Sequence, residues 1–212
     1  MTDNRQYWEQ RFGEEGMIWG ETPSKTAYYA LEIFRSHEIK RILVPGSGYG
    51  RNTKLFSSSG YEVTGVEISE KACTMAKLFD PDSQFYQYSV LDMSFDTTKY
   101  DAIYCFNVLH LFLEEDRKLF LDNCTGKLKK DGLMFFTVFS EEESNFGQGK
   151  EVEKNTFETR PSRPAHYYTE DDLLEQFIDF RIEDTGILSD PEGHGGKPHT
   201  HILRYVLASR IT

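Results

Sequence analysis

Cysteine is scarce in this sequence, and its distribution excludes a disulfide framework. The 212 residues contain three cysteines, an odd number, and Cys73, Cys105 and Cys124 stand far apart inside apolar patterns. Disulfide-stabilised domains and zinc clusters need cysteines in pairs at short, regular spacing. We therefore expect the three thiols to be buried packing residues.

Long apolar runs and an excess of positive charge are also missing. No stretch approaches the roughly 18 apolar residues of a membrane-spanning helix, and the first residues lack a signal-peptide core. The formal net charge of -11 is unfavourable for binding the phosphates of a nucleic acid. These absences predict a monomeric cytoplasmic protein without membrane or nucleic-acid partners, and 212 residues fit one domain, 1–212.

What the sequence does contain is a glycine-rich turn. Gly46, Gly48 and Gly50 alternate directly after the apolar segment 42–44, and a helical pattern begins near Asn52. Because glycine has no Cβ, a ligand can lie against this backbone, and the amides and the helix N-terminus favour polar or negative groups. The turn predicts a ligand-binding loop.

A carboxylate follows at the tip of the next expected strand. Glu67 ends the segment 61–66, about twenty residues beyond the glycines, where it can accept both hydroxyls of a ribose. A dinucleotide fingerprint would need its third glycine at Arg51, and the chain has G-x-G-x-G instead. This spacing disfavours an NAD-dependent oxidoreductase.

From Arg41 onward, strand and helix patterns alternate with short connections. Strands are expected at 41–45, 61–66, 84–88, 100–106 and 133–139, and helices at 51–59, 69–79 and 114–128, with Lys130-Asp131-Gly132 as a turn. Ser69 is expected to cap the second of these helices. Two final strands, 181–188 and 200–208, should pair antiparallel around the loop Gly193–Pro198. We therefore predict an α/β, Rossmann-like, doubly wound sheet of seven mostly parallel strands.

The ligand crevice of such a sheet lies at the carboxyl ends of its strands. The glycine turn, Glu67, Asp92 and Asn107 all fall at such ends. Because Asp92 shares this position with the other three, we expect it to hydrogen-bond an adenine amino group. Its ordinary alternative is a role in a turn or a helix cap.

Two segments outside the predicted core, 41–139, suggest covers for the crevice. Residues 1–40 read as an N-terminal helical extension or lid, with a first helix broken at Gly13 and a second at 25–36. Trp8 fits a core anchor, whereas Trp19 fits a core anchor and a lid over a ligand equally well. Residues 140–168 read as a substrate loop or a solvated excursion, and Thr169 as the cap of a helix that opens the C-terminal part, 169–212.

Three segments together resemble a known family. Val-Pro-Gly-Ser-Gly-Tyr-Gly at 44–50, Gly-Val-Glu-Ile-Ser at 65–69 and the N-terminal segment ending near Trp19 are similar to class I S-adenosylmethionine-dependent methyltransferases. The likeness is to the thiopurine, thiol/halide and tellurite-resistance group, and covers roughly residues 7–208. Many class I enzymes carry an acid where this chain has Val44; the subgroup tends to have a proline at this point, as here at Pro45.

The resemblance implies S-adenosylmethionine as cofactor and assigns residues to its parts. Gly46, Ser47 and Gly48 would face the methionine and ribose, and Glu67, next to Ile68, would hold the ribose hydroxyls. Leu91, Asp92 and Met93 would flank adenine, and Asn107 and Val108 would line the pocket below the sulfonium. Apart from the resemblance, we include Trp19 among the expected cofactor and substrate contacts because a lid over a ligand is one of its two readings.

The acceptor is less defined, and we expect a small molecule. A thiol, or a chalcogen anion such as tellurite or selenite, needs orientation alone, whereas an amine or hydroxyl needs a base. His166 is the first candidate for a substrate-facing base, and His110 is either a base or a pocket wall. Arg160 and Arg163 could attract an anionic substrate.

Other readings remain open or are disfavoured. A non-catalytic protein that binds S-adenosylmethionine is compatible with every motif. Asn107-Val108-Leu109-His110 is not the Asn-Pro-Pro-Tyr type of run that base or amide methylation often shows. His199 and His201 alternate on one strand and, with His194, suggest a metal, but no carboxylate or cysteine stands at fitting spacing, so we expect none.

Overall fold

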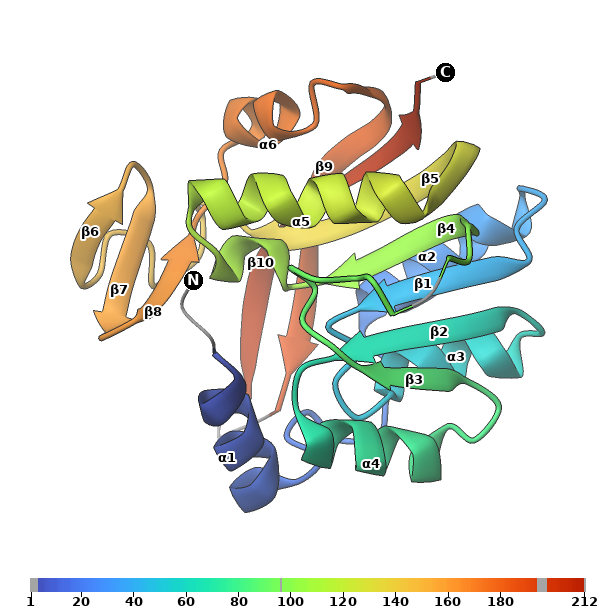
Figure 1. The fold of residues 1–212 in the computed structure, drawn as a ribbon. Coiled ribbons are helices and arrows are strands. Elements are labelled where there is room, and N and C mark those ends of the chain that lie inside the picture. Colours follow the sequence, from blue (N-terminus) through green and yellow to red (C-terminus); the bar gives the residue numbers. More distant parts are fainter. Residues whose placement is uncertain (1–3, 96, 194–197, 212) are drawn as a thin grey trace.

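The computed structural model describes residues 4–95, 97–193 and 198–211, and a seven-stranded sheet forms its centre (Figure 1). The strands are β1 Arg41–Pro45, β2 Glu62–Glu67, β3 Gln84–Gln87, β4 Tyr100–Phe106, β5 Leu128–Phe139, β9 Phe180–Glu192 and β10 His199–Arg210. Their order is β3-β2-β1-β4-β5-β10-β9, with β1 to β5 parallel and β10 antiparallel to both its neighbours. The predicted fold class is confirmed.

Helices cover both faces of this sheet. They are α2 Lys25–Arg35, α3 Arg51–Ser58, α4 Glu70–Phe79, the short 3₁₀ helix η1 Leu109–Leu111, α5 Glu114–Lys127 and α6 Glu170–Gln176. One apolar cluster joins the sheet to α5 and α6 through Phe120 and Phe177, and another joins it to α2 and α3 through Phe34 and Phe56. These two buried layers hold the strand ends rigid, as a precise binding site requires.

Side-chain caps fix where two of the helices begin. The Ser69 hydroxyl accepts a hydrogen bond from the Ala72 amide at the start of α4, and Thr169 accepts one from the Asp172 amide at the start of α6. Each cap satisfies a backbone donor that the first helical turn leaves unpaired. Both predicted caps are confirmed.

The first helix is longer than predicted. It is α1, Arg5–Glu15, and it passes through Gly13 and ends at Gly16, whose φ is 63°. A Cβ at position 13 would meet only the flexible end of the Lys71 side chain of α4, and the helix runs through this glycine without a break. The prediction of a break at Gly13 was therefore wrong.

The predicted turn at Lys130-Asp131-Gly132 was also wrong. The fifth strand begins at Leu128 and contains these residues, with Asp131 at a φ of 57°. The pairing of β4 with β5 shifts register here, between Tyr100 and Ala102, so the strand absorbs the irregular residues without ending.

Residues 140–168 contain a second, three-stranded antiparallel sheet. Its strands are β6 Lys150–Glu153, β7 Thr156–Arg160 and β8 Arg163–His166. Asn155 and Ser162 turn the chain between them at φ values of 57° and 59°, and the Phe157 ring packs edge-on against Phe146 and Tyr167. The expected loop is thus an ordered small sheet, and Figure 1 shows it with α1 beyond the carboxyl ends of the parallel strands.

The cysteines confirm the expectation drawn from their spacing. Cys73, Cys105 and Cys124 are buried and form no disulfide. Burial raises the pKa of the Cys73 thiol to about 12, so it is protonated at neutral pH. In the described residues, no helix is both long and apolar enough to cross a membrane.

Candidate functional site

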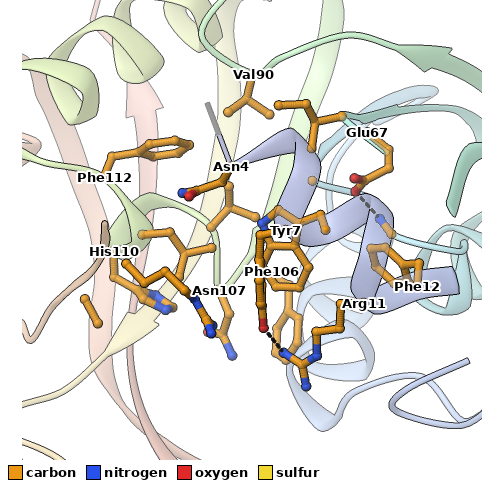
Figure 2. A pocket seen from close by; sticks show the side chains of 18 of the residues that line it. Asn4, Tyr7, Arg11, Phe12, Glu67, Val90, Phe106, Asn107, His110 and Phe112 are labelled. Atoms are coloured by element: carbon orange, nitrogen blue, oxygen red, sulfur yellow. Dashed lines mark hydrogen bonds between the residues drawn. The ribbon is translucent and has the colours of Figure 1, made fainter. Parts of the chain in front are cut away.

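A cavity of about 1270 Å³ opens at the carboxyl ends of the parallel strands, between the glycine turn, α1, η1 and β8 (Figure 2). Most of the residues singled out in the sequence line it: Trp19, Gly46, Ser47, Gly48, Glu67, Ile68, Leu91, Asp92, Asn107, Val108, His110, Arg160 and Arg163. In the view of Figure 2, Glu67 and His110 stand at opposite ends, with Tyr7 between them. The structure therefore brings both predicted halves of the site together.

Two predicted residues lie elsewhere. Met93 is 4% exposed and packs in the main apolar core, so it does not reach the cavity. His166 is buried against the ring of Tyr168, and its Nδ1 lies 2.8 Å from the Thr156 hydroxyl. The prediction that His166 faces the substrate was wrong, because the small sheet turns this side chain inward.

Positive φ angles at all three glycines shape the turn. They are 65° at Gly46, 55° at Gly48 and 91° at Gly50, which precedes α3. A Cβ on Gly46 would overlap a methyl group of Val108, whereas one on Gly48 would only touch the Phe12 ring at 3.7 Å. Gly46 therefore serves the packing between the turn and the end of β4, and Gly48 leaves open backbone beside the cavity.

Glu67 is held by backbone donors at the end of β2. Its Oε2 accepts a hydrogen bond from the Gly48 amide at 3.0 Å, and its Oε1 accepts one from the Ser69 amide at 2.9 Å. Burial raises the pKa of this carboxyl, although the two amides oppose the shift. The carboxylate is thus fixed beside the glycine turn with lone pairs left for a ligand's hydroxyl groups.

The surroundings of the Ser47 hydroxyl indicate whether the cavity suits a nucleoside cofactor with an amino-acid tail. Its Oγ is buried and has no hydrogen-bond partner among the described residues. Gly65 leaves the room for it, since a Cβ there would stand 2.7 Å from this oxygen. A buried hydroxyl without a partner costs free energy, and a polar ligand could pair with it once the side chain rotates toward the cavity. The fixed Glu67 carboxylate beside the open backbone of Gly48 fits such a cofactor.

The polar residues after β3 and β4 are already engaged. Asp92 is exposed, and its Oδ1 accepts a hydrogen bond from the Ser94 amide at 3.2 Å. Hydrogen bonds from the Ser94 side chain and then from its amide lower the pKa of Asp92. Asn107 has a φ of 56°, and its Oδ1 accepts a hydrogen bond from the Thr137 hydroxyl at 3.0 Å. Both line the cavity, and their contacts with a ligand stay predictions.

His110 lies in a stack of rings at the far end of the cavity. Its ring lies 3.9 Å from that of Phe139, which also stacks on His201 at 5.2 Å. Burial lowers the pKa of His110 to about 3, so its imidazole is neutral at pH 7 and a weak base. His110 therefore fits a pocket wall better than a general base.

The N-terminal segment forms a further wall. The Trp19 ring stacks on Tyr49 with 6.2 Å between centroids, as expected of a packing residue, and it also lines the cavity. Its role as a lid over a ligand stays a prediction. From α1, Tyr7 lies under the guanidinium of Arg163 in β8, 3.7 Å from ring centroid to Cζ. This contact joins the two predicted covers across the cavity.

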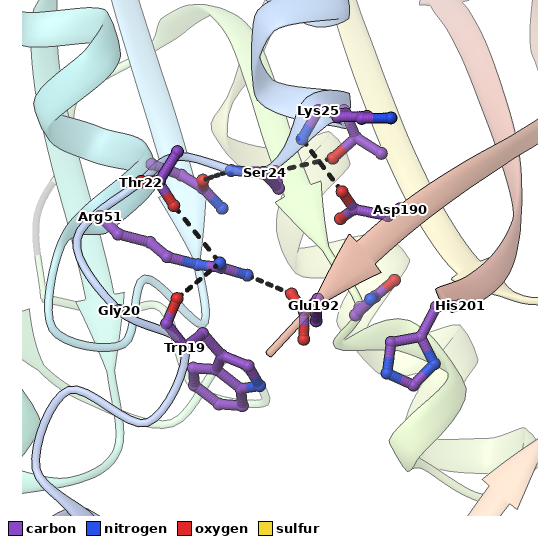
Figure 3. A network of polar contacts seen from close by, with 12 residues as sticks. Trp19, Gly20, Thr22, Ser24, Lys25, Arg51, Asp190, Glu192 and His201 are labelled. Carbon is purple, nitrogen blue, oxygen red and sulfur yellow. Dashed lines mark hydrogen bonds and ion pairs between the residues drawn. The ribbon is translucent and has the colours of Figure 1, made fainter. Parts of the chain in front are cut away.

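An ion pair ties the glycine turn to the end of β9 (Figure 3). Arg51 Nη2 donates to Glu192 Oε1 at 2.5 Å, and both side chains are buried. Arg51 Nη1 donates to the carbonyl oxygens of Trp19 and Thr22, and so fixes the loop after α1. Figure 3 shows Glu192 between Arg51 and His201, and Glu192 and His201 also line the cavity.

Sequence reasoning missed several cavity residues. They are Tyr7, Arg11, Phe106, Phe139 and Glu192. The prediction that no carboxylate accompanies the histidines of β10 was wrong, because antiparallel pairing sets Glu192 opposite His199. A hairpin centred on the loop between the last two strands would have predicted this pair. His194 lies outside the described residues.

Known proteins resemble this chain in part of its sequence and in its fold. Residues 43–136, just under half of the chain, match the family model described as methyltransferase domain. A Geobacillus sp. (strain WCH70) protein, named as a candidate methyltransferase, is 29% identical over 118 residues. The match covers 52% of this chain and 47% of that protein, so the chain spans about half the length of its curated relative.

Solved structures extend the likeness to the whole fold. The 1,6-didemethyltoxoflavin-N1-methyltransferase of Burkholderia thailandensis, solved with S-adenosylhomocysteine, has a TM-score of 0.75 and 19% identity, with 98% of this chain and 87% of that chain covered. TehB from Haemophilus influenzae has a TM-score of 0.68 and 15% identity, with 96% and 67% covered.

The protein thus has a Rossmann-like fold that it shares with the solved methyltransferases named above. Its segment 43–136 matches the family model of a methyltransferase domain.

Proposed function

We propose that the protein transfers a methyl group from S-adenosylmethionine to a small-molecule acceptor. One observation supports this most directly: a single cavity runs from Glu67 and Ser47 to the aromatic wall at His110. Its volume of about 1270 Å³ exceeds the roughly 300–1,000 Å³ usual for one small ligand, so cofactor and acceptor fit together. Bound S-adenosylhomocysteine in the Burkholderia structure supports the choice of cofactor.

The residues have separate tasks in this proposal. Glu67 accepts hydrogen bonds from the ribose hydroxyls, Ser47 meets the polar tail, and Leu91 and Asp92 border adenine. The cofactor supplies an activated methyl group, so the chain's own contribution is to align the acceptor and exclude water. The rings of Tyr7, Phe139 and Trp19 provide the apolar surface that excludes water.

The acceptor end favours a substrate that reaches the site already ionised. Neither histidine proposed as a base is suited to the task, since His166 lies outside the cavity and His110 has a pKa near 3. Arg11, Arg160 and Arg163 add positive charge to the wall on the α1 and β8 side. We therefore propose an anionic acceptor, with thiolates and oxyanions such as selenite or tellurite as first candidates.

Turnover to S-adenosylhomocysteine tests the proposal. Purified protein is incubated with S-adenosylmethionine and panels of thiols, selenite and tellurite, aromatic carboxylates and small amines. We expect turnover with an anionic acceptor and none with the amines. Tight cofactor binding without turnover on any panel would favour a non-catalytic binding protein, and binding of NAD in calorimetry would overturn the cofactor. The cytoplasmic location and the monomeric state remain predictions.

A further inference from the structure

Two histidines and a glutamate lie close together beside the cavity, where β9 ends and β10 begins. Cross-strand pairing sets His199 opposite Glu192 and His201 opposite Asp190. Because residues two apart on a strand share a face, as do directly opposed residues, all four side chains lie on one face of the sheet. One ligand atom each from Glu192, His199 and His201 lies within 4.8 Å of the other two.

The two imidazoles point their Nε2 atoms at each other. The His199 Nε2 lies 3.1 Å from the His201 Nε2. Two nitrogens bound to one tetrahedral ion at about 2.0–2.1 Å stand roughly 3.3 Å apart, so this spacing is close to that of ligands sharing a metal. Small side-chain adjustments would place an ion between them and Glu192.

A second carboxylate orients one of these rings. The His201 Nδ1 lies 2.9 Å from Glu143 Oε1, and Glu143 is 7% exposed and also accepts a hydrogen bond from the Ile202 amide at 2.8 Å. When the Nδ1–H of His201 donates a hydrogen bond to this carboxylate, Nε2 is the nitrogen whose lone pair can bind a metal. This carboxylate–histidine pairing is what metal-binding histidines usually show.

Glu192 brings negative charge to this cluster. Its Oε1 accepts a hydrogen bond from Arg51 Nη2 at 2.5 Å, and a carboxylate can bind a cation through either oxygen. Since Glu192 and His201 also line the cavity, an ion held by these residues has a coordination position facing it. His201 stacks on the same Phe139 ring as His110, which places the ion at the acceptor end.

We propose that Glu192, His199 and His201 form a binding site for a divalent transition metal of the Zn²⁺ type, oriented by Glu143 and open to the cavity. Two imidazoles and one carboxylate suit Zn²⁺ better than Mg²⁺ or Ca²⁺, which prefer oxygen ligands alone. The inference does not depend on the proposed methyl transfer. If that activity is real, the ion would favour the ionised form of an acceptor bound to it.

Titration with Zn²⁺ and Co²⁺ tests the site directly. The full-length protein, free of any histidine tag and stripped with a chelator, is titrated by calorimetry, and Co²⁺ binding is followed by visible absorption. We expect one ion per chain and intense Co²⁺ bands typical of four-coordinate nitrogen and oxygen ligation. Absence of stoichiometric binding to the unaltered protein would overturn the proposal, whatever the variants do.

Variants locate the ion. His199→Ala and His201→Ala should each weaken Zn²⁺ binding more than about tenfold, and Glu143→Gln should weaken it about 10- to 100-fold by removing the orienting charge. His37→Ala is the matched control, because His37 is an exposed histidine at the end of α2. Equal Zn²⁺ affinity in the control and in both β10 variants would show adventitious surface binding and overturn the site. Where a variant unfolds, the Co²⁺ spectrum of His199→Gln provides the same comparison.

Discussion

At the scale of single residues, Glu67 has the largest predicted effect on cofactor binding. Its carboxylate is positioned by the Gly48 and Ser69 amides before any ligand arrives. Pre-positioning means that little conformational freedom is lost when the ribose binds. This makes it the residue whose change most directly tests the cofactor half of the site.

Glu67→Gln should weaken binding of S-adenosylhomocysteine by about 1.5–3 kcal/mol, or about 10- to 150-fold, because a charged hydrogen-bond acceptor is lost. Calorimetry at fixed pH measures this change. Glu62→Gln is the control, since Glu62 lies on the same strand but is exposed and pairs with Arg41. An unchanged dissociation constant in Glu67→Gln would remove the ribose role.

Alanine substitution at two glycines, one crowded and one with open space around it, tests how tightly the glycine turn is constrained. Gly46→Ala puts a side chain at a φ of 65° and against Val108, so we expect the free energy of unfolding to fall by about 2–4 kcal/mol. Gly126→Ala, inside α5 with open space around it, should raise it by about 0.5–1 kcal/mol. Denaturant unfolding compares the two variants. Equal effects would show that the turn is not constrained as described.

At the scale of elements, α1 and the small β6–β8 sheet are the additions that close the cavity. Among its described side chains, α1 buries only Phe12, and Tyr7 reaches the small sheet through Arg163. An element held by so few buried contacts opens more readily than the sheet it covers. We propose that it acts as a lid.

Hydrogen exchange of the α1 amides tests whether this helix opens and closes as a lid. We expect the amides of α1 to exchange faster than those of α5 in the free protein, and to gain protection when S-adenosylhomocysteine binds. Helix α5 serves as the internal control, because its Phe120 and Cys124 are fully buried. If ligand leaves α1 exchange unchanged, the segment is a static wall.

His166 gives the small sheet a pH-dependent stability. Burial, with Arg117 nearby, lowers its pKa to about 4 from 6.5, while Asp172, Lys154 and Glu114 also act on it. The unfolded chain therefore binds a proton that the folded chain does not between pH 6.5 and 4, and stability falls as the pH falls through this range. The contribution is fully present above pH 6.5.

His166→Asn should reduce this dependence, since asparagine can keep a hydrogen bond to Thr156 and does not titrate. We expect the loss of unfolding free energy between pH 6.5 and 4 to be smaller in the variant by about 2–3 kcal/mol. The unfolding free energy of the variant still depends on pH to some extent, because burial lowers the pKa of His110 as well. Denaturant unfolding at several pH values checks this, and parallel curves would contradict it.

At the scale of the whole molecule, a ligand that binds only the folded state stabilises it. S-adenosylhomocysteine at 100 times its dissociation constant should add about 2.7 kcal/mol and raise Tm by roughly 5–10 °C for a chain of this length. NAD at the same concentration is the control and should leave Tm unchanged. A larger shift with NAD in scanning calorimetry would reverse the cofactor assignment.

The sheet, the glycine turn and Glu67 could be predicted from the sequence, because they depend on local patterns: alternation of strand and helix, residues without a Cβ, and an acid at a strand tip. The same patterns predicted the caps Ser69 and Thr169. They did not reveal the small sheet, whose short strands depend on the turns at Asn155 and Ser162 and on ring packing between Phe157, Phe146 and Tyr167.

The orientation of the histidine side chains and the residues that contact them became clear from the folded structure alone. His166 turns inward, and Glu192 faces His199 because two strands pair in one register and not another. Such pairings join residues distant along the chain, and their geometry follows from the packing of the whole molecule, which no local pattern encodes.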